Sequence, residues 1–170
     1  HAVRVAWLGS RTGKKLRIEV LDVSGRPAAS IASDGKWFYF LSHAEQRFYK
    51  KRATDPSLKR IVLIPVKSSD IIALLGGRIP IREHNSVSVI RDSSGHTLIL
   101  KAGFGTIRQK IYFDQSKTTI YKLEMFDMFG SLSYQAEFGK VKPVKGYPIP
   151  FHLKLSNDEE KGFQLRIDRY

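Results

Sequence analysis

The residue types that carry most protein chemistry are sparse in this chain. It has no cysteine, which excludes disulfides and thiolate chemistry. The five histidines stand apart and show no spacing typical of a metal site; they are His1, His43, His84, His96 and His152. No G-x-S-x-G segment marks a nucleophilic serine, and the acidic residues lie mostly in turns, not in pairs suited to acid–base catalysis. We therefore expect no catalytic residue, no metal site and no cofactor, with His43 and His96 at the surface.

A glycine pair followed by arginine, Gly76-Gly77-Arg78, is the nearest approach to a phosphate-binding loop. Phosphate loops precede a helix, because the helix N-terminus supplies the anion site. This pair instead follows an apolar segment that reads as a helix. The segment therefore predicts a turn and not a nucleotide site.

The net charge of +13 is the strongest global signal. Residues 1–60 hold thirteen basic and five acidic side chains, so most of the excess lies in the first third of the chain. A surface this basic attracts phosphate groups, in nucleic acid or in an anionic membrane surface. The alternative is a solvated basic surface that only maintains solubility.

Aromatic residues crowd two neighbouring segments. Residues 37–40 read Trp-Phe-Tyr-Phe, and residues 48–49 read Phe-Tyr just before a run of basic residues at 50–52. One interpretation is a strand buried on both faces. The other is a platform that stacks single-stranded bases while the basic side chains follow the phosphates. Alternation places Arg47, Tyr49 and Lys51 on one face and Phe48, Lys50 and Arg52 on the other, which disfavours nucleic acid.

Strands must position these residues, because most of the chain alternates polar and apolar side chains with period two. Turn residues such as Gly25 and the Asp34-Gly35 pair separate the segments. The pattern predicts a mainly β protein of 170 residues in a single domain, with about ten or eleven antiparallel strands curled into an unclosed half barrel. The expected strands span residues 14–23, 28–33, 36–42, 46–52, 86–92, 96–102, 106–114, 118–127, 131–139, 146–156 and 162–170.

Residues 68–76 are the exception and predict a short helix. Asp70 lies in the first turn of this helix, where a negative charge is favourable, and the apolar residues of the helix leave it almost no polar face. Gly76 and Gly77 end the helix, and Pro80 prevents it from resuming. A helix of this kind must be buried, and the concave face of the sheet is the expected place. It is either a fixed core element or a lid that moves on a glycine hinge. The apolar residues are Ile71, Ile72, Leu74 and Leu75.

Two stretches resemble the LolA/LolB-like lipoprotein carriers of bacteria. The first is LRIEVLDVSGRPAASIASDGKWFYFLSHAEQRFYKK, residues 16–51, and the second is SSDIIALLGGRIPI, residues 68–81. One feature departs from LolB: residues 52–60, RATDPSLKR, occupy the place of its protruding apolar loop, but Leu58 is their only large apolar residue, so no clear loop of that kind is expected.

The resemblance implies an unclosed barrel whose apolar cavity holds acyl chains of lipoproteins or phospholipids, without catalysis. It also implies a periplasmic protein, anchored to the outer membrane through a segment upstream of residue 1. The strands bearing Trp37, Tyr39 and Phe48 would line the cavity. The helix residues Ile71, Ile72, Leu74 and Leu75 would plug it, and Gly76, Gly77, Arg78 and Pro80 would form the hinge or turn.

Overall fold

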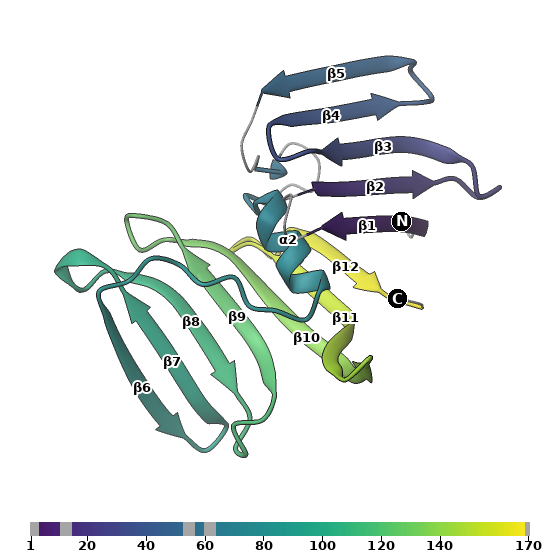
Figure 1. Cartoon of the computed structure of the whole chain (residues 1–170). Helices are drawn as coiled ribbons and strands as arrows, with labels where there is room; N and C mark the ends of the chain where they lie inside the picture. Colours follow the sequence, from purple (N-terminus) through teal and green to yellow (C-terminus); the bar gives the residue numbers. More distant parts are fainter. Residues whose placement is uncertain (1–3, 11–14, 53–56, 60–63, 169–170) are drawn as a thin grey trace. The chain divides into compact units, whose positions relative to one another are not determined.

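The fold is mainly β and antiparallel throughout. The structure, a computed structural model, describes residues 4–10, 15–52, 57–59 and 64–168. Within these residues twelve strands form two sheets, and neither sheet closes on itself (Figure 1). The expected mainly β, unclosed architecture is confirmed. The sequence did not indicate that β5 and β6 stay unpaired, which divides the strands into two sheets.

Internal contacts divide the chain into two compact units. The first comprises His1–Ser57 and Lys67–Ala73, and the second comprises Leu58–Val66 and Leu74–Tyr170. The chain therefore passes from the first unit to the second, returns, and leaves again within the helix. Because the units interleave along the sequence, the expected single domain stays a prediction.

The first sheet is a meander of five strands in chain order. Aspartates start two of its turns. The Asp22 carboxylate accepts hydrogen bonds from the N–H groups of Ser24 and Arg26, at 2.8 and 3.0 Å. The Asp34 carboxylate accepts one from the N–H of Trp37 at 2.7 Å. These turns fix the register of the strands that follow. The strands are β1 (Arg4–Ser10), β2 (Lys15–Leu21), β3 (Pro27–Ser33), β4 (Trp37–Ser42) and β5 (Arg47–Arg52).

The second sheet holds seven strands, in the order β12-β11-β10-β9-β8-β7-β6. Asp127 and Asn157 start two of its turns in the same way as Asp22, each accepting bonds from the N–H groups two and four residues later. The strands are β6 (Ser86–Asp92), β7 (Gly95–Lys101), β8 (Ile107–Phe113), β9 (Ile120–Phe126), β10 (Leu132–Val144), β11 (Tyr147–Ser156) and β12 (Gly162–Arg166), with a short 3-10 turn, η1 (Gly103–Gly105), after β7.

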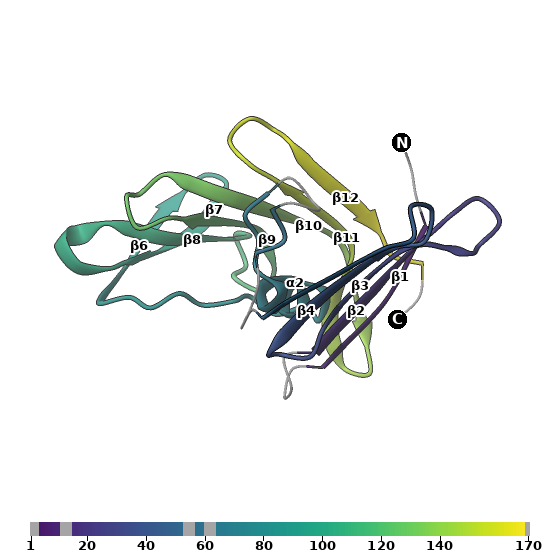
Figure 2. The same ribbon diagram turned by 90° about the horizontal axis from the view of Figure 1, so that it is seen from above.

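One face of the second sheet forms the core of its unit. The segment between α2 and β6 runs across this face (Figures 1 and 2). Gln109, which is fully buried, ties it down: its Nε2 donates to the Pro80 carbonyl at 2.8 Å, and its Oε1 accepts from the Arg82 N–H at 3.0 Å. The face is tightly packed, and its most buried members are Leu100, Ile111, Leu123, Met125, Tyr134, Ala136, Leu153 and Leu155.

The helix α2 (Ser68–Leu75) forms within one residue of its expected bounds. Its four apolar residues, Ile71, Ile72, Leu74 and Leu75, are all buried. This confirms that the helix is a covered element and not a solvated one. Burial of its apolar side chains explains why so short a helix is stable, since eight residues alone would be marginal.

Two details differ from the expectations, and a third concerns the segment compared with the LolB loop. Strand β1 was not predicted, because residues 5–8 read Val-Ala-Trp-Leu and show no clear period-two alternation. His43 is exposed as expected, but His96 is buried, because the β7–β8 register places it opposite Phe113 on the packed face. In the segment compared with the LolB loop, residues 53–56 and 60 lie outside the described part, while Leu58 is buried.

Candidate functional site

The pairing register assigns each strand residue of the first sheet to one of two faces, because side chains alternate along a strand and directly paired residues share a face. One face of the first sheet, the face that carries Gly9 and Trp7, lies toward the helix α2. A Cβ on Gly9 would lie 3.5 Å from the Trp7 ring and 3.6 Å from an Ile72 methyl carbon. We call this the helix-side face.

An apolar row crosses the helix-side face from one edge of the sheet to the other. Five directly paired residues, one from each strand, make up this apolar row: Trp7, Ile18, Ile31, Phe40 and Tyr49. Four strand spacings of about 4.8 Å give the row a length of roughly 19 Å. Its only polar groups are the indole N–H and the phenol hydroxyl.

Burial along the helix-side face is uneven. Leu16, paired with Gly9, is 2% exposed, and Ile31 is 4% exposed. By contrast, Trp7, Ile18 and Phe40 are only half-buried. The apolar row therefore keeps accessible apolar surface, unlike the packed face of the second sheet.

The opposite face of the first sheet carries aromatic and basic residues, and we call it the aromatic–basic face. The rings of Tyr39 and Phe48 stack with centroids 6.4 Å apart. The Lys50 ammonium lies 4.4 Å from the Trp37 ring centroid and 5.7 Å from that of Tyr39. Arg52, paired with Trp37, completes the group.

The structure thus brings together the three aromatic residues expected to line a cavity, but on the aromatic–basic face. Trp37, Tyr39 and Phe48 lie on the side of the sheet opposite Ile72. The apolar row fits the expected role better. Trp7, Phe40 and Tyr49 were not predicted as site residues, because the face that each occupies depends on the pairing register of the strands.

The helix residues divide between the two units. Ile71 and Ile72 belong to the first unit, and Leu74 and Leu75 belong to the second. Leu74 is fully buried, and Leu75 is 2% exposed. A plugging role for these four side chains stays a prediction, but their burial shows that they fill apolar space.

The turn after the helix is closely fitted to β11. Gly77 has φ +68°, a left-handed conformation that favours glycine, and its N–H donates to the Leu74 carbonyl at 3.1 Å. A Cβ at this position would lie 2.4 Å from the Pro148 carbonyl oxygen. Gly77 therefore acts as a helix stop in this conformation. Arg78 is exposed, and Gly76 is partly exposed; movement at Gly76 and Gly77 stays a prediction.

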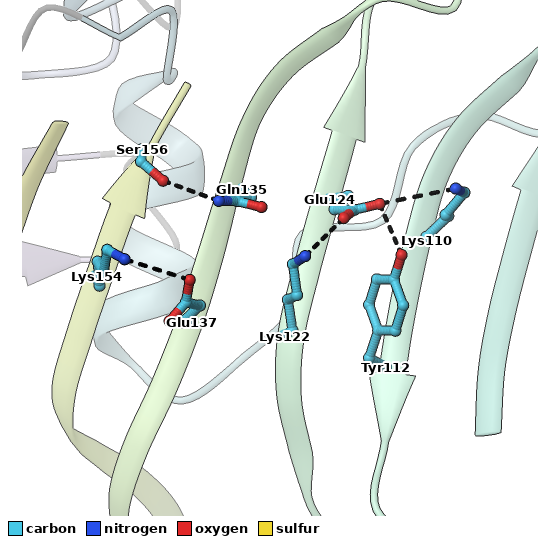
Figure 3. A network of polar contacts seen from close by, with 8 residues as sticks. All are labelled: Lys110, Tyr112, Lys122, Glu124, Gln135, Glu137, Lys154 and Ser156. Carbon is cyan, nitrogen blue, oxygen red and sulfur yellow. Dashed lines mark hydrogen bonds and ion pairs between the residues drawn. The ribbon is translucent and has the colours of Figure 1, made fainter. Parts of the chain in front are cut away.

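The other face of the second sheet carries a polar network (Figure 3). Its centre is Glu124, which accepts a hydrogen bond from the Tyr112 hydroxyl at 2.7 Å and pairs with Lys122 at 2.8 Å and Lys110 at 3.8 Å. Beside it, Gln135 donates to the Ser156 hydroxyl at 3.1 Å. All these contacts join neighbouring positions of the sheet.

Electrostatics within this network favour a charged Glu124. Burial raises the pKa of its carboxyl, but hydrogen bonds from Lys122 and Tyr112 and the charges of Lys122 and Lys110 outweigh burial and leave the pKa below its ordinary value. Burial and the bond to Glu124 raise the pKa of Tyr112 above its ordinary value. Neither shift produces a base or nucleophile near neutral pH. The contacts of Glu124 with Tyr112 and Lys110 join β9 to β8 and thereby stabilise strand pairing.

Among the residues that the structure describes, no three histidine or acidic side chains cluster so as to hold a metal ion. Among the helices within the described ranges, none is long and apolar enough to cross a membrane.

Similarity to known proteins comes from structure and not from sequence. Neither family models nor curated proteins match the chain. A LolA superfamily protein from Nitrosomonas europaea superposes with a TM-score of 0.57 at 14% identity, over 100% of this chain and 81% of that protein. A putative outer membrane lipoprotein-sorting protein domain from Vibrio parahaemolyticus superposes with a TM-score of 0.57 at 13% identity, over 95% of this chain and 72% of that protein.

A third solved structure agrees with these two. A DUF1329 family protein from Desulfovibrio piger gives a TM-score of 0.54 at 11% identity, over 98% of this chain and 77% of that protein. The chain therefore has a LolA/LolB-like fold, as its two resembling stretches predicted.

Proposed function

We propose that this protein binds acyl chains of lipids or lipoproteins on the helix-side face of its first sheet, and that it does so without catalysis. The observation that carries the proposal is the apolar row, which spans the sheet and stays half-buried over Trp7, Ile18 and Phe40. The LolA/LolB-like fold supports it, since one structural neighbour is described as a putative outer membrane lipoprotein-sorting protein domain.

The energetics of the row suit an alkyl chain. Each methylene removed from water contributes about 0.8 kcal/mol, so a long chain needs no polar contact for useful affinity. The row offers almost no hydrogen-bonding groups, and a polar ligand would therefore lose its bonds to water without replacement. This chemistry selects for acyl chains as a class and not for one headgroup.

The helix gives the face a closed end. Ile72 lies against Gly9, and the neighbouring Leu16 is covered. An acyl chain would lie along the uncovered part of the apolar row, and a chain that reached Gly9 would have to displace Ile72. The plug expected from the sequence would then compete with the ligand at this end of the face.

The same reasoning bears on location. A carrier of acyl chains with this fold suits the bacterial periplasm, where lipoproteins cross an aqueous compartment. We therefore propose lipoprotein or envelope lipid handling as the cellular role, with attachment to the outer membrane as a further expectation.

A matched pair on β4 tests the proposal. Phe40 and Tyr39 are adjacent, half-buried aromatic residues on opposite faces of the sheet. Phe40→Ser should weaken binding of a fluorescent acyl probe about 30-fold, from the loss of roughly 2 kcal/mol of apolar contact. Tyr39→Ser should leave probe affinity within about twofold of the wild type.

Urea unfolding of both variants provides the control for stability, because each loses a half-buried ring. Equal losses of probe affinity in two folded variants would contradict the assignment of the face. A wild-type protein that binds no acyl probe would reject the function itself.

A further inference from the structure

The aromatic–basic face has no role in the proposed acyl site, yet it concentrates unusual features. Phe48 is 62% exposed on β5, a strand at the edge of the sheet whose residues are all exposed. Basic residues alone on an edge strand would prevent strand pairing between molecules. An exposed phenylalanine works against that purpose and needs another explanation.

Charge on this face is strongly one-sided. Five basic residues point to it from the strands: Arg4, Lys15, Arg17, Lys50 and Arg52. The one acidic strand residue of the same face, Glu19, already pairs with Arg17 at 2.7 Å. Asp34, at the end of the β3–β4 hairpin, is held by backbone N–H groups and by the Tyr39 hydroxyl. The strands therefore present unneutralised positive charge beside aromatic rings.

We propose that the aromatic–basic face docks on the surface of an anionic lipid bilayer. Aromatic rings and long basic side chains both combine an apolar body with a polar end, which suits the boundary between headgroups and acyl chains. Phe48 would insert, Trp37 and Tyr39 would lie at headgroup level, and Lys50 and Arg52 would contact lipid phosphates. The occupant is the bilayer surface, and a polyanion such as single-stranded nucleic acid is the competing outcome.

Ring geometry favours lipid over nucleic acid. Base stacking requires open ring faces. Here Lys50 lies over the rings of Trp37 and Tyr39, and Tyr39 also stacks on Phe48. Bases would have to displace these contacts, whereas an interfacial role keeps them.

The edge strand supplies a matched test. The double variant Lys50→Gln with Arg52→Gln removes two charges from the aromatic–basic face. The double variant Arg47→Gln with Lys51→Gln removes two charges from the same strand on the helix-side face. Both lower the net charge equally, so a difference reports direct contact and not long-range attraction.

Cosedimentation with vesicles of phosphatidylcholine and phosphatidylglycerol measures the effect. We expect the first double variant to lose about 30-fold in apparent affinity, roughly fivefold for each basic side chain, and the second to lose clearly less. Phe48→Ser should lose about fivefold or more, while Val89→Ser, equally exposed on strand β6 of the second sheet and outside the acyl site, should bind as the wild type does. Binding should weaken with added salt and vanish on pure phosphatidylcholine.

A second readout does not depend on affinity. In a Trp7→Phe variant, Trp37 is the single tryptophan, and brominated phospholipid in the vesicles should quench its fluorescence. Equal losses in the two double variants, an unquenched Trp37, or preferential binding of an oligothymidine that displaces the vesicles would each overturn the proposal. Because acyl binding involves Trp7 and the other face, its failure is distinguishable from failure here.

Discussion

Gln109 offers the most sharply defined test of how the second unit is built. Its carboxamide is fully buried and bonds both the Pro80 carbonyl and the Arg82 N–H. Gln109→Met keeps the length of the side chain and removes both bonds. Two backbone groups of a part-buried segment then lose these hydrogen bonds, each at a cost of about 1–3 kcal/mol. The free energy of unfolding should fall by about 2–5 kcal/mol.

A control lies two strands away in the same sheet. Gln135→Met removes a part-buried amide that bonds the Ser156 hydroxyl at 3.1 Å, and it should cost about 1 kcal/mol or less. Urea denaturation measures both variants, and hydrogen exchange at the Arg82 amide reports the lost bond directly. If Gln109→Met costs no more than Gln135→Met, or if exchange at Arg82 is unchanged, Gln109 does not tie the segment to the sheet.

Three further predictions concern stability. Gly77→Ala should lower the free energy of unfolding, measured by urea denaturation, by more than about 3 kcal/mol, because the new Cβ would lie 2.4 Å from a backbone oxygen. Gly146 also has a left-handed backbone but open space around it, so Gly146→Ala should lower the free energy of unfolding by only about 1–2 kcal/mol. Ionised Glu124 should stabilise the fold above pH 4.5, the pKa of this carboxyl in the unfolded chain, and its contribution should disappear as the pH falls through the lower pKa of the folded state. E124Q should remove this contribution from the pH dependence of the free energy of unfolding. An E124Q variant with the same pH dependence as the wild type would refute the prediction. Leu74→Ser and Leu75→Ser should each cost about 2–5 kcal/mol if the helix is a fixed core element, whereas folded, stable variants with altered probe affinity would favour a lid.

The sequence allowed the fold to be predicted well where local signals were strong. Period-two alternation and turn residues located most strands, and the all-round apolar character of residues 71–75 indicated a buried helix. Strand β1 was missed because Val5 and Trp7 stand in a short stretch without a turn signal before it. The break between β5 and β6 could not be predicted, since pairing between strands depends on long-range contacts.

The candidate site was predicted only in part for a related reason. Side chains alternate between the two faces along a strand, so an error of one residue in the assignment moves a side chain to the other face of the sheet. Trp37 and Tyr39 were therefore assigned to the same side as the helix, while the register places Phe38 and Phe40 there. Composition pointed to the right strand, but only pairing with Ile31 and Tyr49 distinguishes its faces.

Fluorescence quenching tests the central claim most directly, because the two tryptophans lie on opposite faces of the first sheet. Trp37→Phe leaves Trp7 in the apolar row, and Trp7→Phe leaves Trp37 on the aromatic–basic face. Titration with a brominated fatty acid below its micelle concentration should quench Trp7 in a saturable manner and leave Trp37 nearly unchanged. Quenching of Trp37 alone, or of neither tryptophan, would contradict acyl binding on the helix-side face.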